Sequence, residues 1–267
     1  MKALWTPSSE RIANARITDL MAYLNARLGR SIHNYDGLYK LSINEPESFW
    51  DGVWEHAELI GSRNGRILSD HGGMQGTKFY PQSTLNFAEN CLAHDAPDSQ
   101  AAVISYSEAG ERTELTWGEL RLRVANFRNT LQTLGIQKND IVAGFVSNGH
   151  EALVASLATL SIGAIWTSCS PDFGVQGVLD RFGQTKPKVL VAAHTTRYNK
   201  KPIDLTERIN GLLIELPSVT SAVIFDGACP DATRGAIRRP GCKVIAYDEA
   251  ISGEYSLAFE QTAFNHP

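Results

Sequence analysis

The chain has 267 residues, of which 43% are hydrophobic and 20% are charged, a composition typical of globular proteins that fold in water. The formal net charge of −4 gives no electrostatic reason to expect binding to nucleic acid or to an anionic membrane. The N-terminus has no apolar core of a signal peptide, and the longest apolar-leaning run, 152–166, is shorter than the ~20 residues that a bilayer span needs.

Cysteine usage agrees with that picture. The four cysteines form no CxxC pair and no metal-ligand spacing, so they favour reduced thiols in the cytosol. They are Cys91, Cys169, Cys229 and Cys242. We therefore expect a cytoplasmic protein without metal ligands of its own.

The N-terminal third predicts helices that pack through apolar faces. Ser8 or Ser9 opens an amphipathic helix that Gly29 ends. A second helix begins at Pro46 and carries Trp50 and Trp54 one turn apart on its apolar face. These features predict that the N-terminal part of the chain is mainly helical.

The segment between that second helix and residue 95 is rich in glycine and polar residues. Asp70 and His71 suggest acid–base chemistry, but such an isolated pair is more typical of a solvated turn. Ser83 or Thr84 can cap a helix that runs to Leu92.

Residues 101–106 and 113–116 predict two strands of a hairpin. Thr116 and Glu119 then form a capping box that begins a long helix. Downstream, β-branched apolar runs alternate with amphipathic segments. The expected strands are 141–146, 164–168, 187–192, 219–226 and 243–247, and the expected helices are 150–161, 177–184 and 205–216. This alternation predicts an α/β fold with a mostly parallel, doubly wound sheet and helices on both faces.

Asn148 is a candidate cap for helix 150–161. Two other segments are candidate ligand contacts. The first is the turn Ser170–Gly174, which follows the next strand at the sheet edge where ligands of such folds bind. Arg197, Lys200 and Lys201 form a local basic cluster in a predicted loop after a strand, and such side chains suit phosphate. The alternative for that cluster is a solvated loop with ordinary lysines.

Three motifs carry a family resemblance. The segment Leu115–Leu120, the sequence Ser161-Ile162-Gly163-Ala164 and the segment Ile165–Gly174 resemble those of the adenylate-forming acyl-CoA ligases, the superfamily of acetyl-CoA synthetase and luciferase. The resemblance runs along essentially the whole chain, but such ligases are more than twice as long. We therefore expect 1–95 to be the extension and 96–267 to be the first α/β subdomain of the AMP-binding domain, ending before the phosphate loop.

The resemblance implies that a carboxylic acid is activated with ATP and Mg²⁺ and then joined to CoA. The Gly/Ser/Thr-rich phosphate loop with its lysine does not occur in the 267 residues, nor do GxxxxGK[ST], GxGxxG, GxSxG or HExxH. We therefore expect the chain alone to bind at most CoA, to lack catalytic residues and to need the missing C-terminal part of its parent.

The same resemblance gives the binding residues and the substrate. Arg197 and Lys200 match two arginines that hold the nucleotide end of CoA in acetyl-CoA synthetase, with Lys201 as a substitute for the second, and Ser170, Pro171 and Asp172 line the crevice. The 165–174 variant favours the branch that acts on acetoacetate or a similar short 3-oxo acid. The alternatives are a ligase for acetate or propionate, and a non-catalytic module that binds CoA or a nucleotide.

Overall fold

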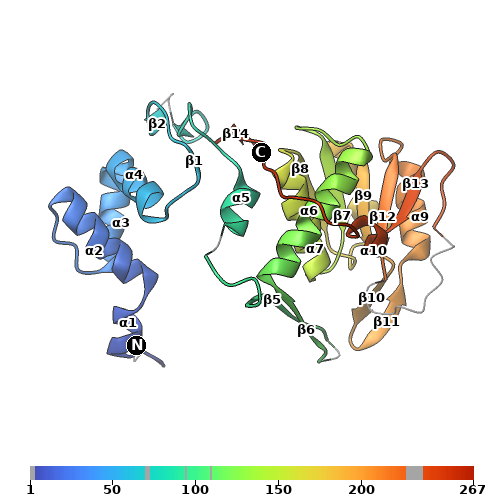
Figure 1. The fold of residues 1–267 in the computed structure, drawn as a ribbon, viewed down its shortest axis with the longest axis horizontal. Coiled ribbons are helices and arrows are strands. Elements are labelled where there is room, and N and C mark those ends of the chain that lie inside the picture. Colours follow the sequence, from blue (N-terminus) through green and yellow to red (C-terminus); the bar gives the residue numbers. More distant parts are fainter. Residues whose placement is uncertain (1–3, 70–72, 94, 109, 227–236) are drawn as a thin grey trace. The chain divides into compact units, whose positions relative to one another are not determined.

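The computed structural model describes residues 4–69, 73–93, 95–108, 110–226 and 237–267, and these form two compact units (Figure 1). Unit 1 runs up to Leu85 and includes Thr262–Pro267, and unit 2 comprises Asn86–Gln261. The predicted candidates Asp70 and His71 lie outside the described residues, as does Cys229.

The described residues of unit 1 form four helices, whose small core includes Leu24, Leu38, Leu41 and Phe49. They are α1 (Ser9–Ala13), α2 (Arg16–Leu28), α3 (Tyr35–Asn44) and α4 (Pro46–His56). The sequence predicted one helix in place of α1 and α2, and that prediction was wrong. None of the α1 residues is buried, so no packing holds α1 in line with α2. The helix is interrupted at Ala15, whose backbone is extended with φ −76° and ψ 134°.

Short strands complete unit 1. An antiparallel sheet has the order β1 (Gly61–Ser62), β4 (Thr84–Leu85), β14 (Thr262–Ala263), and β2 (Leu68–Ser69) pairs with β3 (Lys78–Phe79). The helix predicted from Ser83 or Thr84 therefore begins later. The Ser83 hydroxyl accepts the Asn64 N–H at 3.0 Å instead of capping a helix.

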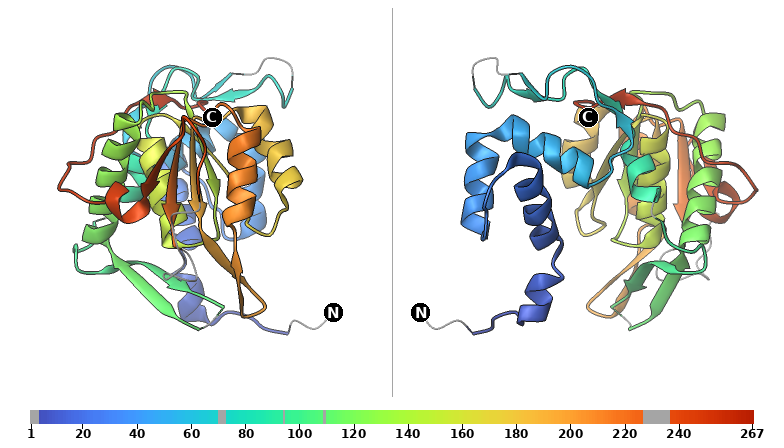
Figure 2. Two further views of the ribbon diagram at one scale, coloured as in Figure 1. Left: turned by 90° about the vertical axis from the view of Figure 1, so that its right-hand side faces the viewer. Right: turned by 60° about the vertical axis from the view of Figure 1, so that its left-hand side comes forward.

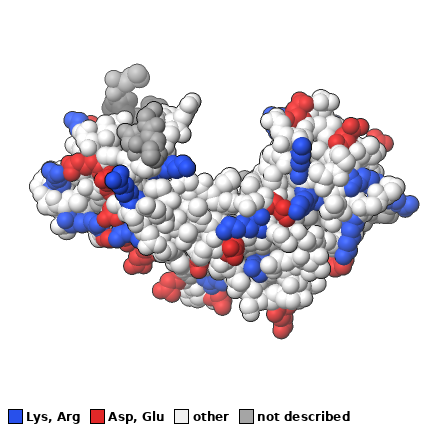
Figure 3. All heavy atoms as spheres, turned by 90° about the horizontal axis from the view of Figure 1, so that it is seen from above, with Lys and Arg blue, Asp and Glu red and all other residues white. Residues whose placement is uncertain are grey.

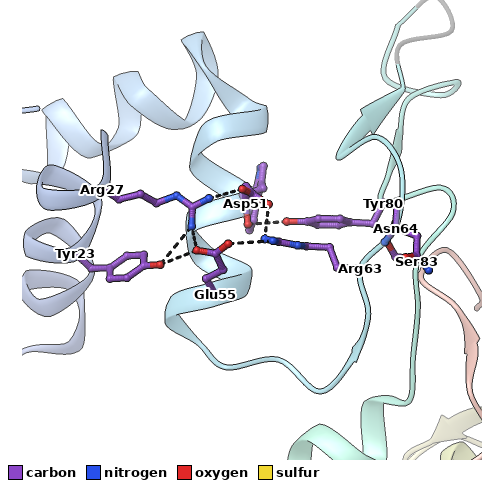
Figure 4. Close-up of polar contacts among 9 residues, drawn as sticks. Tyr23, Arg27, Asp51, Glu55, Arg63, Asn64, Tyr80 and Ser83 are labelled. Carbon is purple, nitrogen blue, oxygen red and sulfur yellow. Dashed lines mark hydrogen bonds and ion pairs between the residues drawn. The ribbon is translucent and has the colours of Figure 1, made fainter. Parts of the chain in front are cut away.

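An ion cluster joins the helices of unit 1 to the segment that follows β1 (Figure 4). Arg27 of α2 pairs with both Asp51 and Glu55 of α4. Arg63 pairs with the same two carboxylates, at 2.5 Å and 3.0 Å, and the Tyr23 hydroxyl donates to Glu55 at 2.9 Å. Two positive and two negative side chains thus balance one another.

Unit 2 is built on a five-stranded parallel sheet, as the sequence predicted. Its spatial order is β13-β12-β9-β7-β8. The strands are β7 (Ile141–Phe145), β8 (Ile165–Cys169), β9 (Val189–Ala193), β12 (Ser221–Phe225) and β13 (Lys243–Ala246). Every residue of β9 and β12 is buried, which explains their continuous apolar sequences.

Helices cover both faces of this sheet, which confirms the doubly wound arrangement. They are α5 (Phe87–Leu92), α6 (Trp117–Thr133), α7 (His150–Ser161), α8 (Val175–Thr185), α9 (Thr206–Glu215) and the short α10 (Tyr247–Ala250). Helix α6 packs against α7, and α8 packs against α9. The left view of Figure 2 shows these two pairs on opposite sides of the strands.

Local sequence explains two of these elements directly. The predicted capping box of α6 is present: Thr116 accepts the Glu119 N–H at 3.2 Å, and Glu119 accepts the Thr116 N–H at 2.8 Å. In β7, a Cβ on Gly144 would lie 2.4 Å from the Trp166 ring of β8, so only glycine allows the neighbouring indole to lie over the strand.

Two hairpins extend from unit 2. The predicted hairpin is formed by β5 (Ala101–Tyr106) and β6 (Arg112–Thr116). The predicted basic loop is instead a second hairpin, β10 (Thr195–Tyr198) and β11 (Lys201–Asp204). Its two turn residues, Asn199 and Lys200, have φ values of 48° and 64°, the left-handed pattern of a tight turn that suits the strand twist.

Two buried asparagines fix the extended end of unit 2. Asn126 donates to the carbonyls of Ile251 and Gly253, at 2.7 Å and 2.8 Å. Asn86, the N-cap of α5, donates to the carbonyls of Leu160 and Glu260, at 2.9 Å and 2.8 Å. These bonds hold the 251–261 segment against the helical layer that contains α6 and α7.

The surface seen from above in Figure 3 shows acidic and basic side chains interspersed, without a gathering of one sign on the part described. Within the described ranges, no helix has the length and apolar character needed to cross a lipid bilayer.

Candidate functional site

A cleft of about 530 Å³ lies at the carboxyl edge of the parallel sheet. The chain leaves β7 and connects to β8 on one side, whereas β9 lies on the other side. Such a reversal of strand order opens a crevice at the carboxyl ends, where ligands of doubly wound folds bind. The lining comes from 105–108, 147–151, 170–172 and 195–198, together with Glu111, Thr113 and Phe225.

One wall of the cleft is the predicted Ser170–Asp172 turn after β8. The Ser170 hydroxyl donates to the Asp172 carboxylate at 2.9 Å, and the Asp172 N–H donates back to the Ser170 hydroxyl at 3.3 Å. From α9, Arg208 donates to the Pro171 carbonyl at 2.8 Å. The turn is therefore fixed from within and from behind, and it presents an acceptor carboxylate.

The β10–β11 hairpin forms a second wall. Arg197 lines the same cleft as Pro171, and its guanidinium donates to the Lys200 carbonyl at 3.3 Å. Lys200 and Lys201 lie at the hairpin tip, are exposed, and do not belong to the cleft lining. The structure thus brings Arg197 together with Ser170, Pro171 and Asp172, and it places the two lysines outside that set.

The loop and helix start after β7 contribute a third wall that the sequence analysis treated only as a structural element. Asn148 was the expected cap of α7, but the N-cap position is occupied by Gly149, so no side chain caps this helix. His150 and Glu151 line the cleft, 3.5 Å apart. Burial lowers the pKa of His150; Arg123 acts in the same direction and Glu151 opposes it. Near neutral pH His150 therefore supplies a neutral imidazole.

Sequence reasoning also missed the acidic contribution of the β5–β6 hairpin. Glu108 and Glu111 line the cleft, and the Glu108 carboxylate accepts the Lys200 N–H at 3.1 Å. No local signal in the sequence connects these positions, because they are 92 residues apart. The alternation of strand and helix places Arg197 and Pro171 at one edge, whereas the hairpin reaches that edge only through tertiary packing.

The cleft lining carries one positively charged side chain, that of Arg197, together with the carboxylates of Asp172, Glu108, Glu111 and Glu151. Arg197 supplies a charged donor for phosphate, and Asp172 supplies an acceptor. Among the described residues there is no group of three or more His, Cys, Asp or Glu side chains that could hold a metal ion.

The fold and the cleft define a doubly wound α/β protein with a crevice at the carboxyl edge of its sheet. The sequence model described as AMP-binding enzyme matches residues 91–249, and the chain belongs to this family. It is 36% identical over 268 residues to an acetoacetyl-coenzyme A synthetase of Rhizobium meliloti. It is also 34% identical over 228 residues to the malonamoyl-CoA synthetase vrtB of Penicillium aethiopicum. This match covers 83% of this chain and 31% of that protein.

A solved structure supports the same relationship. The acetoacetyl-CoA synthetase from Streptomyces lividans superposes with a TM-score of 0.90 at 34% identity, covering 100% of this chain and 40% of that one. The Rhizobium meliloti match likewise covers 100% of this chain and 40% of its relative. The chain thus spans about 40% of the length of these relatives. The resemblance found in the sequence is confirmed, including the fold of this part.

Proposed function

We propose that this chain supplies the CoA-binding part of an ATP-dependent acid–CoA ligase that acts on acetoacetate or a similar short 3-oxo acid. The single observation that carries the proposal is that Arg197 and Pro171, from separate strand ends, line one cleft at the carboxyl edge of the sheet. The names of two of the relatives support the choice of acyl group.

In this proposal Arg197 holds a phosphate of the nucleotide end of CoA, and Lys200 and Lys201 add positive charge from the hairpin tip. Asp172 accepts N–H groups of the ligand, such as the pantetheine amides. Ser170 and Arg208 keep the turn in place and so preserve the shape of the wall. The bound CoA would supply a thiol for attack on an acyl-adenylate, and no residue of this chain is given a part in that chemistry.

The domain assignment and the location belong to the same proposal. Residues 1–95 are the N-terminal extension, and 96–267 belong to the AMP-binding domain, in a protein that works in the cytoplasm on acetoacetate, ATP and CoA. The second candidate substrate is a different short acid, because one of the relatives is named a malonamoyl-CoA synthetase. The malonamoyl group, like the acetoacetyl group, has a carbonyl at position 3.

Calorimetric titration of the 267-residue chain with CoA tests the binding role. Arg197→Gln should weaken CoA binding about five- to tenfold, because a charge-assisted bond to phosphate contributes roughly 1–1.5 kcal/mol at an accessible site. Arg16→Gln is the matched control, because Arg16 is an exposed arginine of unit 1, and it should leave binding unchanged. Equal CoA affinity in wild type and Arg197→Gln would refute the assigned role.

A turnover assay tests whether this chain alone can catalyse the adenylation step. The chain incubated with acetoacetate, ATP, Mg²⁺ and CoA should release no AMP or pyrophosphate. Clear acetoacetate-dependent release would show that these residues suffice for adenylation, contrary to the proposal.

A further inference from the structure

The two hairpins of unit 2 meet through a carboxylate. Glu108, from the β5–β6 hairpin, accepts the backbone N–H of Lys200 at 3.1 Å. Lys200 is a turn residue of the other hairpin, with a φ of 64°. A lysine in this left-handed region costs about 1–2 kcal/mol unless its surroundings hold it. The bond from Glu108 is one such restraint.

The peptide groups of Lys200 are engaged on both sides. Its N–H donates to Glu108, and its carbonyl accepts from the guanidinium of Arg197 at 3.3 Å. A backbone N–H beside a guanidinium and lysine side chains is a donor set that suits phosphate oxygens. In this structure an internal carboxylate already occupies the N–H of that set.

We propose that Glu108 is an internal competitor for the phosphate position at the β10–β11 turn, and that it makes the cleft select ligands with a terminal phosphate monoester. This inference rests on the proposed CoA-binding function. A phosphate monoester carries about −1.5 to −2 charges and three acceptor oxygens, so it displaces a single carboxylate. A ligand without this phosphate gains nothing from the displacement and leaves Glu108 in place.

The change Glu108→Gln tests the charge while keeping the size and an acceptor oxygen. Removing an exposed competing charge should tighten CoA binding about two- to fivefold at low salt, with the difference shrinking as ionic strength rises. Dephospho-CoA, which lacks the 3′-phosphate, should bind wild type and variant equally. The ratio of the two affinities should therefore increase.

Glu111→Gln is the matched control. Glu111 lies on the same hairpin and lines the same cleft, but its carboxylate accepts from the Ser107 hydroxyl at 3.1 Å. The Glu111→Gln change removes one negative charge, as Glu108→Gln does, but it leaves the bond between the Lys200 N–H and Glu108 in place. If Glu111→Gln tightens CoA binding as much as Glu108→Gln, general electrostatics explain the effect and the inference is overturned.

A second readout separates this inference from the proposed function. The amide resonance of Lys200 is followed by NMR during titration with inorganic phosphate, which does not require CoA recognition. In Glu108→Gln the midpoint should fall to a lower phosphate concentration than in wild type, and an unchanged midpoint overturns the inference. If CoA binds to neither protein while the phosphate midpoint shifts, the proposed function fails and the competition stands.

Discussion

Asn86 offers a sharp test of how the extended end of unit 2 is held. The side chain is 1% exposed. It caps α5 by accepting the Glu89 N–H at 3.2 Å and donates to the carbonyls of Leu160 and Glu260. Asn86→Ala removes a cap worth about 1 kcal/mol and takes away the side-chain donor of the Glu260 carbonyl, at about 1–3 kcal/mol, whereas the Leu160 carbonyl keeps the Gly163 N–H at 3.0 Å. We expect a loss of about 2–4 kcal/mol from the free energy of unfolding of unit 2.

Asn34 provides the comparison. It also caps a helix, accepting the Gly37 N–H at 2.9 Å, but it is exposed. Asn34→Ala should therefore cost only about 1 kcal/mol. Asn86→Ser keeps a capping oxygen but cannot reach both carbonyls, so it should recover about 1 kcal/mol of the Asn86→Ala loss.

Because the chain divides into two compact units, the assay must report on each of them separately. Hydrogen exchange read by mass spectrometry reports protection of peptides from α5, from the end of α7 and from 251–261 during a urea series. Asn86→Ala should reduce protection in all three together. Equal losses for Asn86→Ala and Asn34→Ala would refute the argument that the buried donor bonds hold this segment.

Three further expectations follow from local geometry. Lys186 ends α8 with a φ of 54° while its N–H bonds to the Phe182 carbonyl, so Lys186→Gly should raise the free energy of unfolding by about 0.5–1 kcal/mol in urea titrations. The hydrogen bonds from Thr116 lower the pKa of Glu119 below its usual 4.5. The ionised Glu119 carboxylate therefore stabilises the fold fully above pH 4.5, and this contribution is lost as the pH falls through the lower pKa of the folded state. Glu119→Gln should consequently flatten the acid side of a plot of unfolding free energy against pH. Burial raises the pKa of Tyr80 to about 12, with Asp51 acting in the same direction. The neutral phenol therefore stabilises the fold below about pH 10, and this contribution is lost as the pH rises toward 12. Ultraviolet titration should show one late-ionising tyrosine fewer in Tyr80→Phe than in wild type.

The sequence predicted the features that depend on neighbours along the chain. The parallel strands of unit 2 were recognisable as β-branched runs, and the capping box needed only Thr116 and Glu119. The resemblance implied that Arg197 and Pro171 share one crevice, and both line the cleft at the carboxyl edge of the sheet. The strands and the capping box are each determined within about twenty residues of sequence.

Features that depend on distant contacts were missed. Ser83, Thr84 and Asn86 are all good caps, and Asn86 is the one used because its amide also reaches Glu260, 174 residues away. The β10–β11 hairpin has Asn199 and Lys200 at its turn and no glycine, so the usual signal for such a turn was absent.

The last residues of unit 1, Thr262–Pro267, come from the end of the chain and are therefore synthesised last. Phe264 packs its ring 4.9 Å from that of Tyr80 and 6.1 Å from that of Trp54, and β14 pairs with β4 from across 177 residues of chain. During synthesis the ribosome therefore delivers these side chains only after all of unit 2 has emerged. Closing so long a loop is unfavourable for an unfolded chain, so prior folding of the intervening α/β unit would shorten the search. The ring contacts of Phe264 and the pairing of β14 with β4 therefore form after the sheet of unit 2, whereas the helical core around Leu24 and Phe49 contains no residue of the late segment.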